Sequence, residues 1–219
     1  GLGNVGGKLA NSLLRNKFDL TVRDLNQDLI KPFIDSGAKT ASSEKELAKK
    51  VDLIITCLPS PQICADVMEA KDGILNGLSK NKIWLEMSTT DEEDMKSLSK
   101  KLLEKKAEVI EAPITGGQHR AESGNIAILV GGERDSFNRA FPILSCIGHE
   151  ILHCGEIGKA STLKVVTNYL ASINLLAIGE ALMVCKKYDI NLKTAFEGIK
   201  ISSGNSFVHE TESQVILNE

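Results

Sequence analysis

Apolar residues along the first 155 positions follow two different spacings. Apolar side chains three or four positions apart, as at Leu9 and Leu13, predict amphipathic helices, whereas short apolar and β-branched runs such as 52–58 predict buried strands. Helices are expected at 8–16, 27–36, 44–50, 91–105 and 134–144, and strands at 20–22, 38–40, 52–58, 82–87, 108–114, 126–130 and 150–154. Because helices alternating with buried strands favour parallel pairing, the pattern predicts an α/β domain.

The spacing changes after Gly158. Apolar residues recur at helical intervals from 161 to 188, with Gly179 as the only glycine, which predicts one long and largely buried helix. A second helix is expected at 192–199, and no strand is expected after Cys154. The chain is therefore predicted to contain an α/β domain at 1–155, followed at 156–219 by a long interdomain helix and the start of an all-α domain.

Composition narrows the range of partners. The 219 residues are 42% hydrophobic and 25% charged, with a net charge of −3, which is typical of a globular protein and unfavourable for nucleic-acid binding. The longest apolar runs, 53–58 and 170–178, are short or interrupted by polar residues, so we expect no membrane-embedded segment.

The five cysteines are odd in number, and neither C-x-x-C pairs nor metal-like spacing to the four histidines is present. This pattern favours reduced core thiols over reactive or zinc-bound cysteines and predicts no metal site. Free thiols in turn favour an intracellular compartment.

A glycine motif opens the chain. Its residues are Gly1, Leu2, Gly3, Asn4, Val5 and Gly6, which fit the G-x-G-x-x-G pattern. Glycines there allow a tight turn and a close approach of the backbone to a pyrophosphate, which then faces a helix N-terminus. The motif predicts a Rossmann-type dinucleotide-binding domain. Such a loop normally follows a strand, and no strand precedes Gly1, so we expect the first strand of the domain to be missing.

Asp24 ends the strand that follows the first helix. An acid at this point accepts hydrogen bonds from the adenosine ribose and repels a 2′-phosphate, so NAD is favoured over NADP. The adjacent Arg23 weakens that preference. The alternative role for Asp24 is that of a turn or N-cap residue before the next helix.

Three further clusters lie after predicted strands, where ligands of parallel sheets bind. Residues 58–60 and 88–90 each follow an apolar strand, although Ser88 or Thr90 also suits a helix N-cap. The third cluster, 115–117, follows Pro113 and contains two glycines. Its open backbone N–H groups suit an anion such as a substrate carboxylate, and the alternative is a simple glycine turn.

Lys164 and Asn168 lie four positions apart on the long helix and so share one face. The lysine has apolar neighbours, Leu163, Val165 and Val166, and their burial would lower its pKa and supply a neutral amine as a proton acceptor. The alternative is a solvated lysine, which is the common case on a helix.

Taken in this order, these clusters resemble the β-hydroxyacid dehydrogenases, and within that family the 3-hydroxyisobutyrate dehydrogenase branch. The resemblance spans nearly the whole chain and includes 129–132, Phe137 and Gly148. It implies hydride transfer between a short 3-hydroxy acid and NAD, with Lys164 as the catalytic acid and base. It implies substrate binding by Thr115, Gly116, Gly117 and Asn168. It implies cofactor binding by Gly1, Leu2, Gly3, Asn4, Val5, Gly6, Asp24, Leu58, Pro59 and Thr89.

The resemblance also implies a small hydroxy acid or its aldehyde as partner and a homodimer or homotetramer built through the helical domain. The cytoplasm and the mitochondrial matrix are both compatible, because the N-terminus is missing. Three features depart from the family: Ala160 stands where glycine is usual, the strand expected before Gly1 is missing, and the chain stops at Glu219, before the later helices. The family's substrate-binding serine is Thr115 here, which keeps the hydroxyl and adds a methyl group.

Other functions remain open at this point. One alternative is an NADPH-dependent glyoxylate or succinic semialdehyde reductase of the same superfamily. Those enzymes carry an asparagine-arginine pair at the position of Asp24, so Asp24 argues against this alternative. It argues in the same way against a 6-phosphogluconate dehydrogenase. A non-catalytic dinucleotide-binding scaffold is favoured by Ala160 and by the truncation, whereas Lys164 and Asn168 argue against it.

Overall fold

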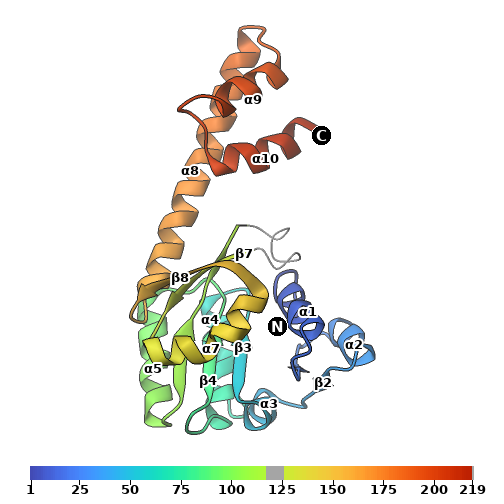
Figure 1. Ribbon diagram of the computed structural model, residues 1–219, viewed down its shortest axis with the longest axis vertical. Helices are drawn as coiled ribbons and strands as arrows, with labels where there is room; N and C mark the ends of the chain where they lie inside the picture. Colours follow the sequence, from blue (N-terminus) through green and yellow to red (C-terminus); the bar gives the residue numbers. More distant parts are fainter. Residues whose placement is uncertain (117–125, 219) are drawn as a thin grey trace. The chain divides into compact units, whose positions relative to one another are not determined.

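The computed structural model describes residues 1–116 and 126–218, which form two compact units, Gly1–Lys164 and Val165–Glu219 (Figure 1). The helices of the first unit are α1 (Gly6–Arg15), α2 (Gln27–Asp35), α3 (Glu44–Lys50), α4 (Pro61–Glu69), the 3₁₀ helix η1 (Ile74–Asn76), α5 (Glu92–Glu104) and α7 (Arg134–Ile147). Its strands are β1 (Thr21–Val22), β2 (Lys39–Thr40), β3 (Leu53–Thr56), β4 (Ile83–Glu86), β5 (Glu108–Glu111), β6 (Ile114–Thr115), β7 (Ile126–Gly131) and β8 (Gly148–Gly155).

The α/β fold predicted from the sequence is confirmed, with differences in detail. The periodicity did not predict α4 and η1, and the strand expected at 108–114 is divided into β5 and β6 around Pro113. Proline has no N–H to donate and interrupts a strand at this point.

The strands form two sheets. β1 and β2 pair in parallel as a two-stranded sheet, and the larger sheet has the order β3-β4-β5-β7-β6, with β8 also paired to β7. β3, β4 and β5 are parallel to one another, as predicted. The expectation of parallel pairing fails at β7, which runs antiparallel to both β5 and β6, while β8 is parallel to β7. Apolar content alone predicts a buried strand but does not fix its direction.

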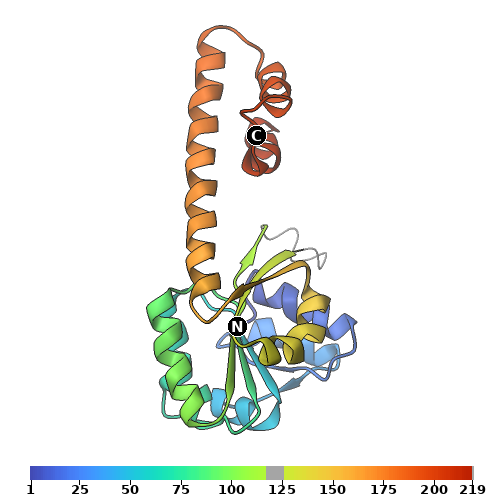
Figure 2. The same ribbon diagram turned by 60° about the vertical axis from the view of Figure 1, so that its left-hand side comes forward.

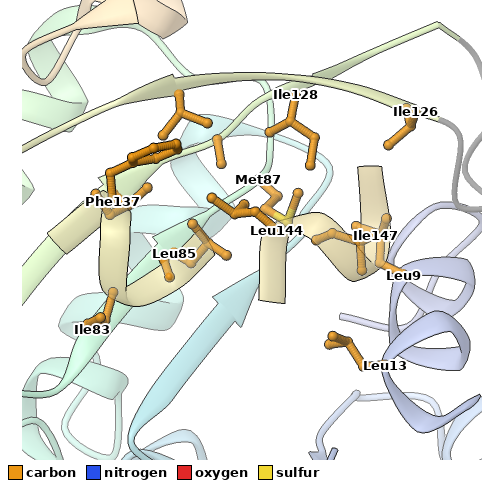
Figure 3. Packing of buried hydrophobic residues seen from close by; sticks show 14 residues of the cluster. Leu9, Leu13, Ile83, Leu85, Met87, Ile126, Ile128, Phe137, Leu144 and Ile147 are labelled. Carbon is orange, nitrogen blue, oxygen red and sulfur yellow. The ribbon is translucent and has the colours of Figure 1, made fainter. Parts of the chain in front are cut away.

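The large sheet separates two apolar cores because successive residues of a strand point to opposite faces. Ile83 and Leu85 of β4 pack with residues of α1 and α7 in one cluster (Figure 3), whereas Trp84 packs with α3, α4, η1 and α5 in the other. Figures 1 and 2 show α5 and α7 on opposite sides of the sheet. Helices on both faces leave the ends of the parallel strands as the place for a ligand site.

The second unit contains most of α8 (Lys159–Lys187), together with α9 (Leu192–Lys200) and α10 (Phe207–Asn218), the last of which the sequence pattern did not predict. Ile178 and Leu182 of α8 pack with Ala195 of α9 in a small apolar cluster. His209 of α10 is buried, with Nε2 3.0 Å from the carbonyl oxygen of Phe196. α9 and α10 are thereby tied to each other by a buried side chain.

The expectation that α8 is largely buried is wrong for this structure. Apolar side chains along its middle are exposed, among them Tyr169, Leu170, Leu176 and Met183. Helical periodicity predicts that a face will be covered but does not identify the covering segment. α8 also has the length and composition of a membrane span, with a mean hydropathy of 1.4 over its most apolar window, contrary to the sequence expectation that no segment does. Length and composition alone are weak evidence for a span, because core helices of soluble proteins share them.

Candidate active site

The glycine loop packs tightly against the residues that follow β3. A Cβ atom on Gly6 would lie 2.1 Å from the carbonyl oxygen of Gly1, and one on Gly1 would lie 2.7 Å from the carbonyl oxygen of Cys57. In contrast, a Cβ on Gly3 would have no protein atom within 4 Å. The loop leads into α1, whose N-cap residue Val5 makes no side-chain capping hydrogen bond. The N–H groups of Gly7 and Leu9 already donate to the carbonyl oxygens of Gly3 and Val5, so what the start of α1 offers a phosphate is mainly the positive end of the helix dipole.

Asp24 fixes this loop from the end of β1. Its Oδ2 accepts a hydrogen bond from the backbone N–H of Leu2 at 2.6 Å, and its Oδ1 accepts one from Asn26 at 2.8 Å. Burial alone would raise the pKa of Asp24, but these backbone N–H groups outweigh it and the pKa lies below its ordinary value. The N-cap of α2 is Asn26, so the alternative cap role for Asp24 is wrong, whereas the hydrogen bond from Asn26, two residues on, is the local turn contact of the other alternative.

Arg23 points toward a second acid. Its Nη1 donates to the carbonyl oxygen of Asp24, and its Nη2 lies 3.5 Å from Oε1 of Glu44 at the start of α3. The guanidinium of Arg23 is thus already paired with a carboxylate beside the loop.

The ends of β3 and β4 are joined by hydrogen bonds that the sequence pattern did not reveal. The backbone N–H of Leu58 donates to Oγ of Ser88 at 2.8 Å, and the backbone N–H of Ser88 donates to Oε1 of Glu86 at 2.5 Å. Oε2 of Glu86 accepts from Oγ1 of Thr56 at 2.5 Å and from Sγ of Cys64 at 2.8 Å. Glu86 is completely buried, so this carboxylate fixes the two strand ends in relation to each other.

Thr89 is exposed, whereas its neighbours Ser88 and Thr90 are buried. Neither neighbour caps a helix, because the N-cap of α5 is Asp91, which accepts from the backbone N–H of Asp94 at 2.8 Å. The N-cap alternative for these two residues is therefore wrong, and Thr89 is left with its side chain open to a ligand. Leu58 is half-buried and Pro59 is exposed at the neighbouring strand end.

The third cluster begins at β6. Thr115 is half-buried on β6, and Gly116 follows it with φ of +112°, a conformation that favours glycine. Gly117 lies outside the described residues. Of this cluster, the structure thus describes Thr115 and Gly116.

Lys164 lies on the second turn of α8 and is only 8% exposed. Its burial lowers its pKa below the ordinary value near 10.5, because low-dielectric surroundings disfavour the ammonium form. The burial does not come from the neighbours named in the sequence argument, since Val165 and Val166 are about half exposed. It comes from the packing of the start of α8 in the first unit. Asn168, one turn further along the helix, belongs to the second unit and is exposed.

Within the first unit, hydrogen bonds connect several of these clusters. Asp24 contacts the glycine loop, Ser88 contacts Leu58, and Oγ1 of Thr90 lies 3.3 Å from Oγ of Ser161 at the start of α8. Buried acids within apolar strands, here Glu86 and Glu111, are the signal that would have identified the supporting residues from sequence.

Family models match both parts of the chain. Residues 1–155 match the NAD binding domain of 6-phosphogluconate dehydrogenase, and residues 158–219 match the NAD-binding domain of NADP-dependent 3-hydroxyisobutyrate dehydrogenase.

Curated relatives agree with these models. A mitochondrial 3-hydroxyisobutyrate dehydrogenase of Mus musculus is 33% identical over 215 residues, which cover 98% of this chain and 64% of the relative. A 2-(hydroxymethyl)glutarate dehydrogenase of Eubacterium barkeri is 30% identical over 217 residues, which cover 99% of this chain and 72% of the relative. The chain thus spans just under two thirds of the length of the mouse protein.

Among solved structures, Psf3 in complex with NADP+ and 2-OPP superposes with a TM-score of 0.92 at 24% identity, covering 100% of this chain and 77% of the other. This likeness shows that the fold is shared. With the family models, the curated relatives and the glycine loop of the first unit, it leads to one assignment: the chain belongs to the β-hydroxyacid dehydrogenase family.

Proposed function

We propose that the protein catalyses reversible hydride transfer between a short 3-hydroxy acid and NAD, with Lys164 as the general acid and base. The observation that carries this proposal is the burial of Lys164 at the start of α8, with its pKa lowered, in the same compact unit as the glycine loop. Burying an amine costs free energy, and perturbed pKa values gather at functional sites.

The residues of the first unit fit a dinucleotide. The open position of Gly3 leaves space for the backbone to approach a pyrophosphate, and the positive end of α1 favours its negative charge. The ionised Asp24 is fixed where it can accept hydrogen bonds from the ribose hydroxyls. When bound, the nicotinamide ring accepts or returns the hydride.

The division of labour among the residues follows from their chemistry. Neutral Lys164 accepts the proton of the substrate hydroxyl as hydride leaves the same carbon, and in the reverse direction its ammonium returns that proton to the carbonyl oxygen. Backbone N–H groups at Thr115, Gly116 and Gly117 hold the carboxylate, and Asn168 orients the substrate. Thr89 and the Leu58-Pro59 pair contact the cofactor beside the reacting carbon.

The preference for NAD over NADP rests on charge. The ionised Asp24 repels a 2′-phosphate, and Arg23, the adjacent cation, is paired with Glu44. The NADP+ complex of Psf3 has the same fold, so the fold does not exclude NADP, and we expect the residues around the ribose to set the preference. An NADPH-dependent reductase is the alternative that a cofactor comparison tests directly.

The substrate class follows from the relatives. 3-Hydroxyisobutyrate and 2-(hydroxymethyl)glutarate, named in the two relatives above, are both carboxylic acids with a primary alcohol on the carbon next to C2. They differ in the substituent on C2, which one pocket wall can select. We therefore expect a primary 3-hydroxy acid, oxidised to the aldehyde.

The proposal extends to assembly. Apolar side chains exposed along α8, such as Tyr169, Leu176 and Met183, favour a homodimer or homotetramer built through the helical region. Light scattering after size-exclusion chromatography tests it, and a monomer at micromolar concentration would contradict it.

The deciding experiment is turnover by the full-length protein with NAD or NADP and a panel of 3-hydroxy acids, for wild type and Lys164→Ala. The proposal predicts NAD reduction that is lost in Lys164→Ala, with cofactor binding retained. Cofactor binding without turnover in the wild type would favour a scaffold, and a preference for NADP would refute the assignment of Asp24.

A further inference from the structure

Glu111 is a buried acid at the end of β5 to which the proposed chemistry gives no role. Its side chain has no solvent exposure, and its register partner across the antiparallel ladder is Gly131 of β7. A Cβ atom on Gly131 would lie 2.2 Å from Oε1 of Glu111. The glycine therefore leaves the space that the carboxylate occupies.

The carboxylate of Glu111 points at the beginning of α8. Oε1 accepts hydrogen bonds from the backbone N–H groups of Gly158 at 2.7 Å and Ala160 at 2.9 Å. Oε2 accepts from Oγ of Ser161 at 2.5 Å. The first N–H groups of a helix have no partner within the helix, so an acid from a neighbouring strand satisfies them and also complements the positive end of the helix dipole.

Two further contacts make this junction specific. Gly158 has φ of +99°, and a Cβ there would lie 2.6 Å from Cγ of Glu92, so glycine is required at the turn before α8. Oγ of Ser161 also lies 3.3 Å from Oγ1 of Thr90, beyond the end of β4. The start of α8 is thus tied to two neighbouring strands of the parallel sheet.

The face of α8 held in this way is the face that carries Lys164. Ala160, Ser161 and Lys164 are the buried residues of its first two turns, and positions four apart on a helix lie one above the other. A rotation or shift of the first turn would therefore move the amine of Lys164 by a similar amount.

We propose that Glu111 is a positioning residue that fixes the first turn of α8, and through it the amine of Lys164, in the active geometry. This inference rests on the proposed function of Lys164. Glu111 itself accepts no proton from the substrate. Its carboxylate sets the register of the helix on the sheet, and Ser161 extends that link to the segment carrying Thr89.

Glu111→Gln is the variant to test, because it keeps the volume and replaces one acceptor oxygen by an N–H₂ group facing another donor. We expect kcat to fall about 10- to 100-fold, the effect of displacing a reacting group by about 1 Å. The Kd for NADH, measured by fluorescence titration, should not change, because the hydrogen bonds described for Glu111 go to the start of α8 and not to the glycine loop. Hydrogen exchange in a peptide covering 156–166 should be faster.

Glu108→Gln is the matched control on the same strand. Glu108 is partly exposed and pairs with Arg139, away from the contacts to α8. It should leave kcat and the exchange of 156–166 at their wild-type values. Ser161→Ala serves if Glu111→Gln does not fold, since it removes one of three donors, and its kcat should fall by a smaller factor.

Three outcomes would overturn the inference. If Lys164→Ala is inactive but Glu111→Gln and Ser161→Ala retain the wild-type kcat, Glu111 does not position the lysine. The same follows if Glu111→Gln weakens NADH binding as much as it lowers kcat, because the defect would then be general. If Lys164→Ala itself retains turnover, the proposed function fails first, and the inference fails with it.

Discussion

The spacing of atoms around Gly3 and Gly6 gives a prediction that separates cofactor binding from folding. In Gly6→Ala, the new Cβ would meet the carbonyl oxygen of Gly1 at 2.1 Å, so the loop must open by more than about 1 Å to reach ordinary van der Waals contact. Such overpacking costs about 1–3 kcal/mol, which lowers Tm by about 2–12 °C for a chain of this size. Gly6→Ala should therefore lose both stability and cofactor affinity.

Gly3→Ala differs in its expected effect. The new Cβ would have no protein atom within 4 Å, and Gly3 is not among the glycines with positive φ, so the fold should keep its stability. If the backbone at Gly3 approaches a pyrophosphate, the methyl group occupies that space and displaces at least one N–H donor. A hydrogen bond to a charged group contributes about 1.5–3 kcal/mol, so the Kd for NADH should rise about 10- to 150-fold.

The assay is fluorescence titration of both variants with NADH, together with thermal unfolding monitored by circular dichroism. Contact between the loop and the dinucleotide predicts normal unfolding with weak NADH binding in Gly3→Ala, and defects in both measurements for Gly6→Ala. Gly3→Ala with the wild-type Kd would refute it, because the loop would then be a plain turn without contact to the dinucleotide.

Three further predictions follow from buried or open positions. Glu86→Gln should destabilise the protein by about 1–3 kcal/mol in urea titrations, because its buried carboxylate accepts from three donors and joins the ends of β3 and β4. It should also weaken NADH binding. If the variant keeps the wild-type affinity for NADH, Glu86 does not support the cofactor site. Because burial lowers the pKa of Lys164 and the neutral amine is the base, kcat/KM for alcohol oxidation should rise with pH through a midpoint below that of an ordinary lysine. For aldehyde reduction it should fall through the same pKa, and flat profiles would contradict this role. Gly179 lies on α8, where a Cβ atom would meet no atom within 4 Å. Gly179→Ala should therefore raise the free energy of unfolding by about 1 kcal/mol, because alanine favours a helix more than glycine does. A urea midpoint below that of wild type would show that the α8 surface at Gly179 is covered by another part of the protein.

Lys164 shows where local sequence and tertiary structure give the same answer for different reasons. Apolar neighbours in the sequence predicted a buried lysine with a lowered pKa, and both features are confirmed. Yet Val165 and Val166 are themselves exposed. The lysine is buried because α8 begins against the sheet, which no property of the adjacent residues determines.

The acids Glu86 and Glu111 show what local pattern misses. Both lie in strands predicted as apolar and buried, and they are register partners on β4 and β5. Their donors come from segments as far as 50 positions away in the sequence, as for Ser161. A periodic pattern assigns such a residue to a strand, but only the packed structure supplies the groups that make its burial tolerable.

Local sequence was enough to predict most helices and strands in their order, though not α4, η1 and α10, and to predict the glycine loop that opens α1, because period and glycine content are local properties. Tertiary structure decided the antiparallel direction of β7, the exposure of the middle of α8 and the carboxylate contacts at Glu86 and Glu111. Strand direction and burial depend on which distant segments pack together. That choice is made by the free energy of the whole packed unit rather than by any one stretch of chain.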